Sequence, residues 1–308
     1  MKSLKKLFTV MLLIFGLLLL VGCGEDDNKT YKVLLPSGTP LMAVGGLLDD
    51  AEFDFKVVNG QDPLISGFTS AEYDMIIAPI NLGTKFYIAG NSNYQFKAII
   101  TTNNTYIISK GEISSLNDLQ GKKITAFGAS AAPGLALKGA LDIKGIDATV
   151  NYQNSAADVM MLYSSNTDDS DFYLSAEPNI TKIEDKTGKP INKISLQEQI
   201  KDELPVLIQA CLFVNPNSNV SNKVINKIKE NIENMNKNPE NYAKQVLNKN
   251  DFFNGLGESV IAKAIPNCNI DFIEAKDNKD VITKYYDFLN KYQNAVLGGK
   301  TPSEEFYI

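Results

Sequence analysis

Small polar residues follow several β-rich runs of the sequence, at the positions where strands are expected to end. Pro36-Ser-Gly-Thr-Pro40 comes after the first run, Asn81 follows the third, and Phe127-Gly-Ala-Ser-Ala131 follows another. Open α/β sheets bind ligands beyond the carboxyl ends of their strands, where loops and helix N-termini offer backbone N–H groups. These loops could therefore hydrogen-bond a small molecule, although capping turns would use the same residues.

Two more segments carry hydrogen-bonding groups. Thr101-Thr-Asn-Asn-Thr105 is a run of small polar residues between two β-rich stretches, and it could contact a ligand or satisfy a turn. Glu177 follows another strand and could accept from a ligand N–H or begin a helix. With two nearby aromatic side chains, the predicted ligand-binding residues are Ser37, Gly38, Thr39, Asn81, Thr101, Thr102, Asn103, Tyr106, Phe127, Gly128, Ala129, Ser130 and Glu177.

The composition excludes several kinds of catalytic site. The chain has no histidine and no arginine, which rules out imidazole-dependent hydrolysis, histidine-ligated metals and bidentate arginine clamps. Gly298-Gly-Lys-Thr301 lacks the earlier glycine of a phosphate-binding loop, because position 294 is Asn294. Asp168–Asp171 and Asp277–Asp280 lack the glycine and glutamate of a calcium loop. We expect no catalytic residue, no metal site and no cofactor.

The elements that would position these loops alternate between strands and helices, which predicts an α/β fold. One helix is expected at Val220–Met235, where apolar residues recur about every fourth position. We predict two lobes, each a mainly parallel sheet flanked by helices and joined by two crossing segments. The expected strands are Tyr31–Pro36, Phe53–Val58, Tyr73–Ala78, Phe96–Thr101, Thr105–Ser109, Lys123–Phe127, Thr149–Tyr152, Asp171–Ser175, Ile191–Leu196 and Val206–Val214.

The predicted domain plan is discontinuous. Residues 31–103 and 209–296 form lobe 1, residues 104–208 form lobe 2, and residues 297–308 form a C-terminal tail. The apolar stretches Ile99–Ser109 and Val206–Val214 are the candidate hinges.

The N-terminus has the pattern of a bacterial lipoprotein signal. Residues 1–22 combine early lysines with an apolar run too short to span a bilayer, and Leu20-Val-Gly-Cys23 is similar to a lipobox. An ordinary signal peptide with an incidental Cys23 is the alternative. We expect Cys23 to be lipidated, with residues 23–30 as a tether, and the protein to be extracytoplasmic and held to the cell membrane by this anchor alone.

Two further cysteines, Cys211 and Cys268, are too few and too isolated for a metal quartet or a CxxC redox motif. The sequence does not decide whether they form a disulfide, and two buried free thiols are the favoured interpretation. The acidic balance, with an isoelectric point near 4.9, excludes a nucleic-acid partner because nothing would offset phosphate repulsion.

Several segments, in order, carry a family resemblance over nearly all of the chain after the signal. They are Tyr73–Pro79, Ser115–Ile124, Phe127–Ser130, Ala176–Pro178 and Gly298–Pro302 with Phe306-Tyr307. The chain resembles type 2 periplasmic binding proteins of ABC importers, in the nitrate/sulfonate/taurine and thiamine-precursor branch. The resemblance implies a monomer that binds its solute between two lobes and delivers it to ABC permease subunits.

The residues themselves favour a small planar or zwitterionic solute, such as a pyrimidine, a thiamine precursor or a sulfonate. Solutes that relatives hold with arginine or histidine are in doubt, since both are absent. The alternatives are an extracytoplasmic enzyme on the same fold and a surface receptor or adhesin that works without a transporter.

Overall fold

The computed structural model describes residues 29–165, 167–298 and 300–308. By contacts the chain divides into two compact units, Met1–Thr30 and Tyr31–Ile308. The predicted signal peptide and Cys23 lie outside the described residues. Within those residues, no helix is both long and apolar enough to cross a membrane. Everything below concerns the second unit.

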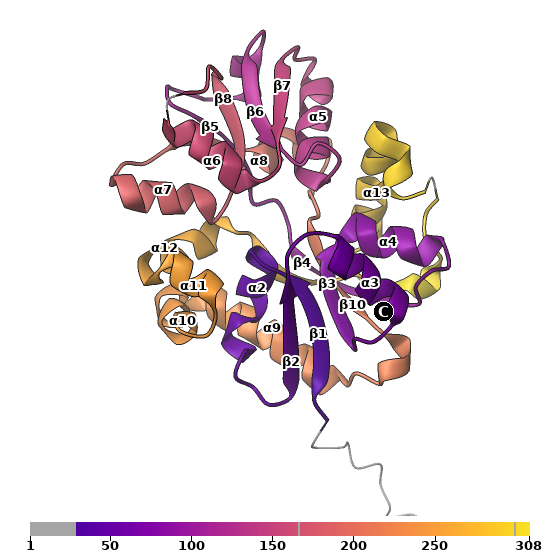
Figure 1. Ribbon diagram of the computed structural model, residues 1–308. Helices are drawn as coiled ribbons and strands as arrows, with labels where there is room; N and C mark the ends of the chain where they lie inside the picture. Colours follow the sequence, from indigo (N-terminus) through magenta and orange to yellow (C-terminus); the bar gives the residue numbers. More distant parts are fainter. Residues whose placement is uncertain (1–28, 166, 299) are drawn as a thin grey trace, which may run out of the picture. The chain divides into compact units, whose positions relative to one another are not determined.

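Eleven strands of the described chain form two sheets, and Figure 1 labels all of these strands except β9 and β11. Sheet A has the order β11-β4-β10-β3-β1-β2 and contains β1 (Tyr31–Pro36), β2 (Phe53–Val58), β3 (Met75–Pro79), β4 (Gln95–Thr101), β10 (Ala210–Val214) and β11 (Ile270–Glu274). Sheet B has the order β7-β6-β8-β5-β9 and contains β5 (Thr105–Ser109), β6 (Lys123–Phe127), β7 (Thr149–Gln153), β8 (Phe172–Ala176) and β9 (Asn192–Ser195).

Both sheets are mixed rather than mainly parallel. Strand β1 pairs in parallel with β2 and β3, and β6 pairs in parallel with β7 and β8. The other pairings are antiparallel. The cause is the chain path: β5 enters sheet B directly after β4, and β10 returns between β3 and β4, so neither strand follows a crossover helix of its own sheet.

Helices cover both faces of each sheet (Figure 1). On sheet A, one face packs against α3 (Asp62–Ser70), α4 (Ile80–Ile88) and α13 (Lys279–Gln293). The opposite face packs against α2 (Thr39–Val44), α9 (Asn222–Lys237), α10 (Pro239–Val246), α11 (Asp251–Leu256) and α12 (Glu258–Ala264). On sheet B, α5 (Ala132–Lys144) and α8 (Leu196–Ile200) cover one face, and α6 (Ala156–Ser165) and α7 (Asn179–Thr187) cover the other.

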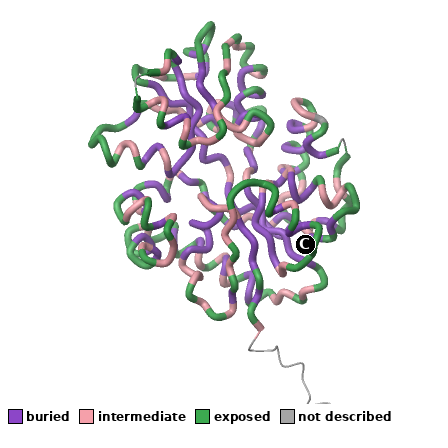
Figure 2. The backbone as a smooth tube through the Cα atoms, in the orientation of Figure 1, coloured by how far each residue is buried: buried purple, intermediate pink, exposed green. Residues whose placement is uncertain are grey.

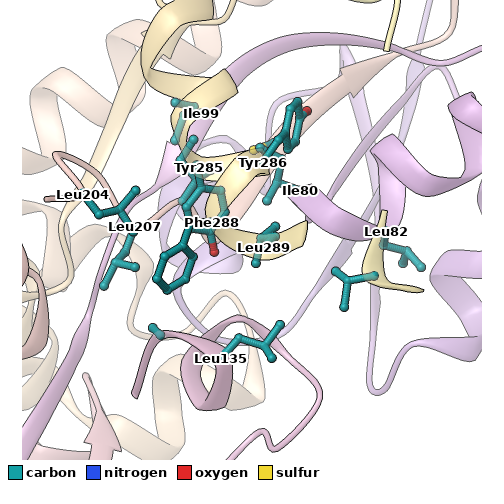
Figure 3. Packing of buried hydrophobic residues seen from close by; sticks show 14 of the residues in the cluster. Ile80, Leu82, Ile99, Leu135, Leu204, Leu207, Tyr285, Tyr286, Phe288 and Leu289 are labelled. Atoms are coloured by element: carbon teal, nitrogen blue, oxygen red, sulfur yellow. The ribbon is translucent and has the colours of Figure 1, made fainter. Parts of the chain in front are cut away.

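The central strands are buried, while exposed positions gather on the outer helices (Figure 2). One hydrophobic cluster runs from sheet A to the α5 face of sheet B. Figure 3 shows its middle, where Tyr285 and Phe288 of α13 gather with Leu207 and with Leu135 of α5. A Cβ atom added at Gly139 of α5 would lie 2.3 Å from the Phe288 ring, so this glycine lets the two helices approach.

All ten predicted strands are present: four have the predicted ends, and five have ends shifted by one or two residues. Residues 206–209 of the predicted Val206–Val214 strand precede β10, and there the side chain of Gln197 donates to Leu204 O and accepts from the N–H of Leu207. Strand β11 was not predicted. Helix α9 begins at Asn222 since Ser221 caps it by accepting from the N–H of Val224.

The C-terminal residues join sheet A. Phe306 is fully buried against Phe96 and Phe213, and the N–H of Ile308 donates to Phe96 O at 3.1 Å. The predicted tail therefore contributes to the core.

Cys211 and Cys268 are both buried free thiols, as favoured from the sequence, and they belong to clusters on opposite faces of sheet A.

Candidate functional site

A cavity of about 370 Å³ lies where strand ends of both sheets meet. Its walls come from residues directly after β1, β3, β6 and β8 and from the approach to β10. The carboxyl ends of the parallel strands thus face one space, as in other open α/β sheets. The volume is near the lower end of the roughly 300–1,000 Å³ typical of small-molecule pockets.

Five prolines line the cavity, and four of them lie at the start of a helix. Pro40 and Pro133 stand in the first turns of α2 and α5, and Pro79 and Pro178 immediately precede α4 and α7. Proline fixes φ near −65° and is tolerated at helix starts, where its missing N–H would have no helical partner. These prolines give the cavity stiff, apolar walls.

Two glycines shape the loops at the cavity. Gly38 caps α2 with φ 101° and ψ −146°, a conformation that essentially only glycine adopts. Gly134 lies in the first turn of α5, where its N–H donates to Gly128 O at 3.1 Å. An added Cβ at Gly134 would sit 2.2 Å from that oxygen. Glycine at 134 is therefore needed for the loop after β6 to fold back on α5.

The polar segment between β4 and β5 is mostly bonded within the protein. Thr101 accepts from the backbone of residues 209 and 210, and Asn103 bonds the backbone of Thr105 in both directions. Thr102 donates to Asn269 O through both its N–H and its hydroxyl. Thr101 and Asn104 line the cavity, but Thr102 and Asn103 do not. The segment chiefly builds the crossing between the sheets.

The carboxylate of Glu177 is engaged by the protein. Its side chain is fully buried; Oε2 accepts from the N–H of Thr181 at 3.0 Å, and Oε1 lies 3.3 Å from Lys193 Nζ. It thereby bonds an N–H in the first turn of α7, which is the alternative that the sequence left open. Both oxygens thus have partners within the protein, and the expectation that this carboxylate also accepts from a ligand N–H stays a prediction.

The Tyr106 hydroxyl also has a hydrogen-bond partner within the protein. It donates to Asn267 O at 3.0 Å, and burial raises the pKa of Tyr106 to about 12. The ring lies under Lys193 Nζ, 5.5 Å from its centroid, outside the cavity lining.

The structure brings about half of the predicted set together. The residues that line the cavity are Ser37, Gly38, Thr39, Asn81, Thr101, Phe127 and Glu177. Those that do not line it are Thr102, Asn103, Tyr106, Gly128, Ala129 and Ser130. The loop after β6 presents its later residues instead, because the bonds from Ala131 and Gly134 to Gly128 O turn it toward the start of α5.

Several lining residues were not predicted. The polar ones are Gln61, Asn104, Asn179 and Gln209, and the large apolar ones are Phe252 and Leu256 of α11. Asn179 follows a predicted strand exit, and Gln209 lies in a predicted crossing segment, so the sequence held a signal for both. Nothing in the sequence places α11 at the cavity.

Glu177 is the sole charged residue among the described residues that line the cavity, and its charge is paired with Lys193. No group of three or more metal-ligating side chains occurs in the described ranges. The lining offers amides, hydroxyls and apolar surface.

Two carboxylates on sheet-B helices bond helices of sheet A. Asp185 of α7 accepts from Ser259 and Lys263 of α12, at 2.7 and 2.8 Å. Asp142 of α5 accepts from Lys291 and Tyr292 of α13, at 3.0 and 2.7 Å. These hydrogen bonds lower the pKa of both aspartates. The largest effect on Asp185 comes from Lys263, and the largest effect on Asp142 comes from Tyr292.

Comparison with known proteins identifies the fold. No protein-family model and no curated protein sequence matches the chain. Among solved structures, an ABC transporter protein from Parabacteroides distasonis superposes with TM-score 0.78 at 17% identity, covering 92% of this chain and 99% of that one. The periplasmic aliphatic sulphonate binding protein SsuA from Escherichia coli gives 0.67 at 12% identity, with 91% and 92% covered.

The alkanesulfonate-binding protein SsuA from Xanthomonas axonopodis pv. citri, bound to MOPS, gives 0.56 at 12% identity, with 92% and 98% covered. The chain therefore has the α/β fold of periplasmic binding proteins. At these identities the likeness concerns the fold.

Proposed function

We propose that the protein is the solute-binding component of an ABC importer, acting as a monomer outside the cytoplasm and performing no chemistry on its ligand. The observation that carries this proposal is the cavity lined by strand ends of both sheets, in a fold shared with proteins described as ABC-transporter and sulfonate-binding proteins. The absence of histidine and arginine from the sequence supports binding rather than catalysis.

The proposed mechanism is closure of two lobes around the solute. Lobe 1 would comprise residues 31–103 and 209–296, and lobe 2 residues 104–208, each built on one sheet. The chain passes between the sheets after β4 and before β10, so Ile99–Ser109 and Val206–Val214 are the proposed hinges. Closure would remove the solute from water and present a surface that ABC permease subunits recognise.

The proposed anchor is a lipid on Cys23 after removal of residues 1–22. Each buried methylene contributes about 0.8 kcal/mol, so several acyl chains would hold the protein at the membrane surface. Replacing Cys23 with serine should move the protein from the membrane fraction to the soluble fraction and abolish palmitate labelling. Retention in the membrane fraction without label would contradict the anchor.

Binding can be tested with metabolites from yeast extract. After incubation and desalting, the protein should carry one small molecule per chain, unchanged in mass, and melt at a higher temperature. Asn81→Ala should lower the recovery, because Asn81 lines the cavity and none of the protein hydrogen bonds described involves its side chain. Asn93→Ala, at an exposed asparagine away from the cavity, is the matched control. Sustained conversion of a compound in the extract would favour an enzyme instead.

A further inference from the structure

The chemistry of the cavity lining restricts the class of solute, given the solute-binding function proposed above. We propose that the solute carries no ionised group, and that it combines an apolar body with amide- or hydroxyl-type hydrogen-bonding groups. This class excludes zwitterions such as amino acids. It also excludes sulfonates, the ligands after which some of the structural neighbours are named.

The first observation concerns negative charge on the solute. Among the described residues that line the cavity there is no lysine, and the chain has no arginine or histidine. A sulfonate or carboxylate removed from water into such a space would have no cationic partner. Burying an unpaired charge costs far more than burying a hydrogen-bonded neutral group.

Backbone N–H groups supply only part of what an anion would need. In α5, Pro133 lacks an N–H, and the N–H of Gly134 is bonded to Gly128 O. In α4 the N–H of Ile80 donates to Gln209 O at 3.1 Å, and in α7 the N–H of Thr181 donates to Glu177. Prolines and protein acceptors have thus already removed donors from the first turns that face the cavity.

The second observation concerns positive charge on the solute. An ammonium group needs a carboxylate or several free oxygen acceptors. Glu177 supplies the sole carboxylate of the described lining, and it is fully buried between Lys193 and the first turn of α7. A cation at the cavity would have to compete with Lys193 for it, so neither a cation nor a zwitterion finds an unpaired carboxylate in the described lining.

The third observation is the nature of the remaining surface. Phe127 and Phe252 are half-buried and line the cavity from sheet B and from α11, and five prolines and several alanines complete apolar walls. Side-chain amides of Asn81, Asn179 and Gln209 interrupt these walls. Such a lining matches an uncharged molecule whose polar groups both donate and accept.

The test identifies the bound molecule rather than assuming it. The purified protein is incubated with yeast extract, desalted and denatured, and the released compound is identified by mass spectrometry. We expect a compound without an ionised group at neutral pH, recovered at least about fivefold less from Asn81→Ala and equally from Asn93→Ala. Millimolar taurine, ethanesulfonate, nitrate and alanine should each leave the melting temperature unchanged.

Two results would overturn the inference. A released compound that carries a carboxylate, sulfonate, phosphate or ammonium group, or a rise of about 3 °C or more with any of the four charged probes, would refute the uncharged class while leaving the solute-binding function in place. If the extract yields no bound compound and no probe raises the melting temperature, the proposed function fails as well, and the inference with it.

Discussion

Tyr292 donates its hydroxyl hydrogen to Asp142 over 2.7 Å and so ties α13, on sheet A, to α5, on sheet B. A second pair of helices is tied in the same way, because Asp185 of α7 accepts hydrogen bonds from Ser259 and Lys263 of α12. In both contacts the carboxylate belongs to a sheet-B helix, and a lysine and a hydroxyl belong to a sheet-A helix. These contacts can hold the sheets together without touching the cavity lining.

The first prediction is that these contacts weaken in acid. Their aspartate pKa values are lowered by the hydrogen bonds, so the stabilisation is fully present above the ordinary value of 3.8 and is lost as the pH falls through the lowered values. The double variant Asp142→Asn, Asp185→Asn should melt below the wild type at neutral pH, and the difference should vanish in acid. Asp147→Asn, at an exposed aspartate, should match the wild type at every pH. A difference independent of pH would contradict the role of the charges.

The second prediction concerns the loop after β6. Gly134→Ala would place Cβ 2.2 Å from the oxygen and 2.7 Å from the carbonyl carbon of Gly128, both backbone atoms that cannot rotate away. We expect a loss of about 1–3 kcal/mol in the free energy of unfolding and weaker solute binding. Urea denaturation measures the first effect. Gly255→Ala in α11, where a Cβ meets nothing within 4 Å, should cost nothing or stabilise slightly. Equal effects of the two changes would rule out the clash.

The third prediction separates a buried ion pair from an exposed one. Lys193→Met leaves the buried Glu177 carboxylate without its cation, and we expect unfolding to become easier by about 1–3 kcal/mol. Lys201→Met removes a pair with Glu198 whose side chains are 57% and 61% exposed, and its effect should be near zero. Chemical denaturation of both variants tests this. Restoration of stability by adding Glu177→Gln to Lys193→Met would support the assignment, and failure to restore it would count against it.

The fourth prediction concerns the thiols. Burial raises the pKa of Cys211 and of Cys268, so neither should react with a thiol reagent in the native protein. In a Cys23→Ser background both should react after denaturation without any reductant. Finding no reactive thiol until a reductant is added would reveal a disulfide and contradict the structure.

The sequence predicted the central elements well because their signals are local. Strands such as β1 and β6 are apolar runs bounded by turn residues, and α9 has a regular apolar stripe. Strand β11 was not predicted, because Asp271 and Glu274 interrupt the apolar run in its five residues. The mixture of parallel and antiparallel strand pairs was not predicted either, since strand direction depends on where the chain re-enters a sheet.

Prediction of the candidate site was limited in the same way, because the sequence shows local signals but not tertiary contacts. Strand exits identified Ser37, Asn81 and Phe127, because a strand end is visible in sequence. The partners that occupy Glu177 are distributed along the chain, with Lys193 sixteen residues away. Whether a polar side chain faces a ligand or another residue is decided by such tertiary neighbours, which spacing along the chain does not show.

The position of β10 between β3 and β4 has a consequence for the order in which the protein can assemble. Both neighbours belong to the first 101 residues, yet the strand that joins them is contributed by residues 210–214. Sheet B is complete once β9 has ended at Ser195, whereas at that point sheet A still has a gap at its centre. A chain emerging from its N-terminus must therefore keep the apolar edges of β3 and β4 unpaired while the inserted sheet is made, and during that interval they are exposed to aggregation or to a chaperone.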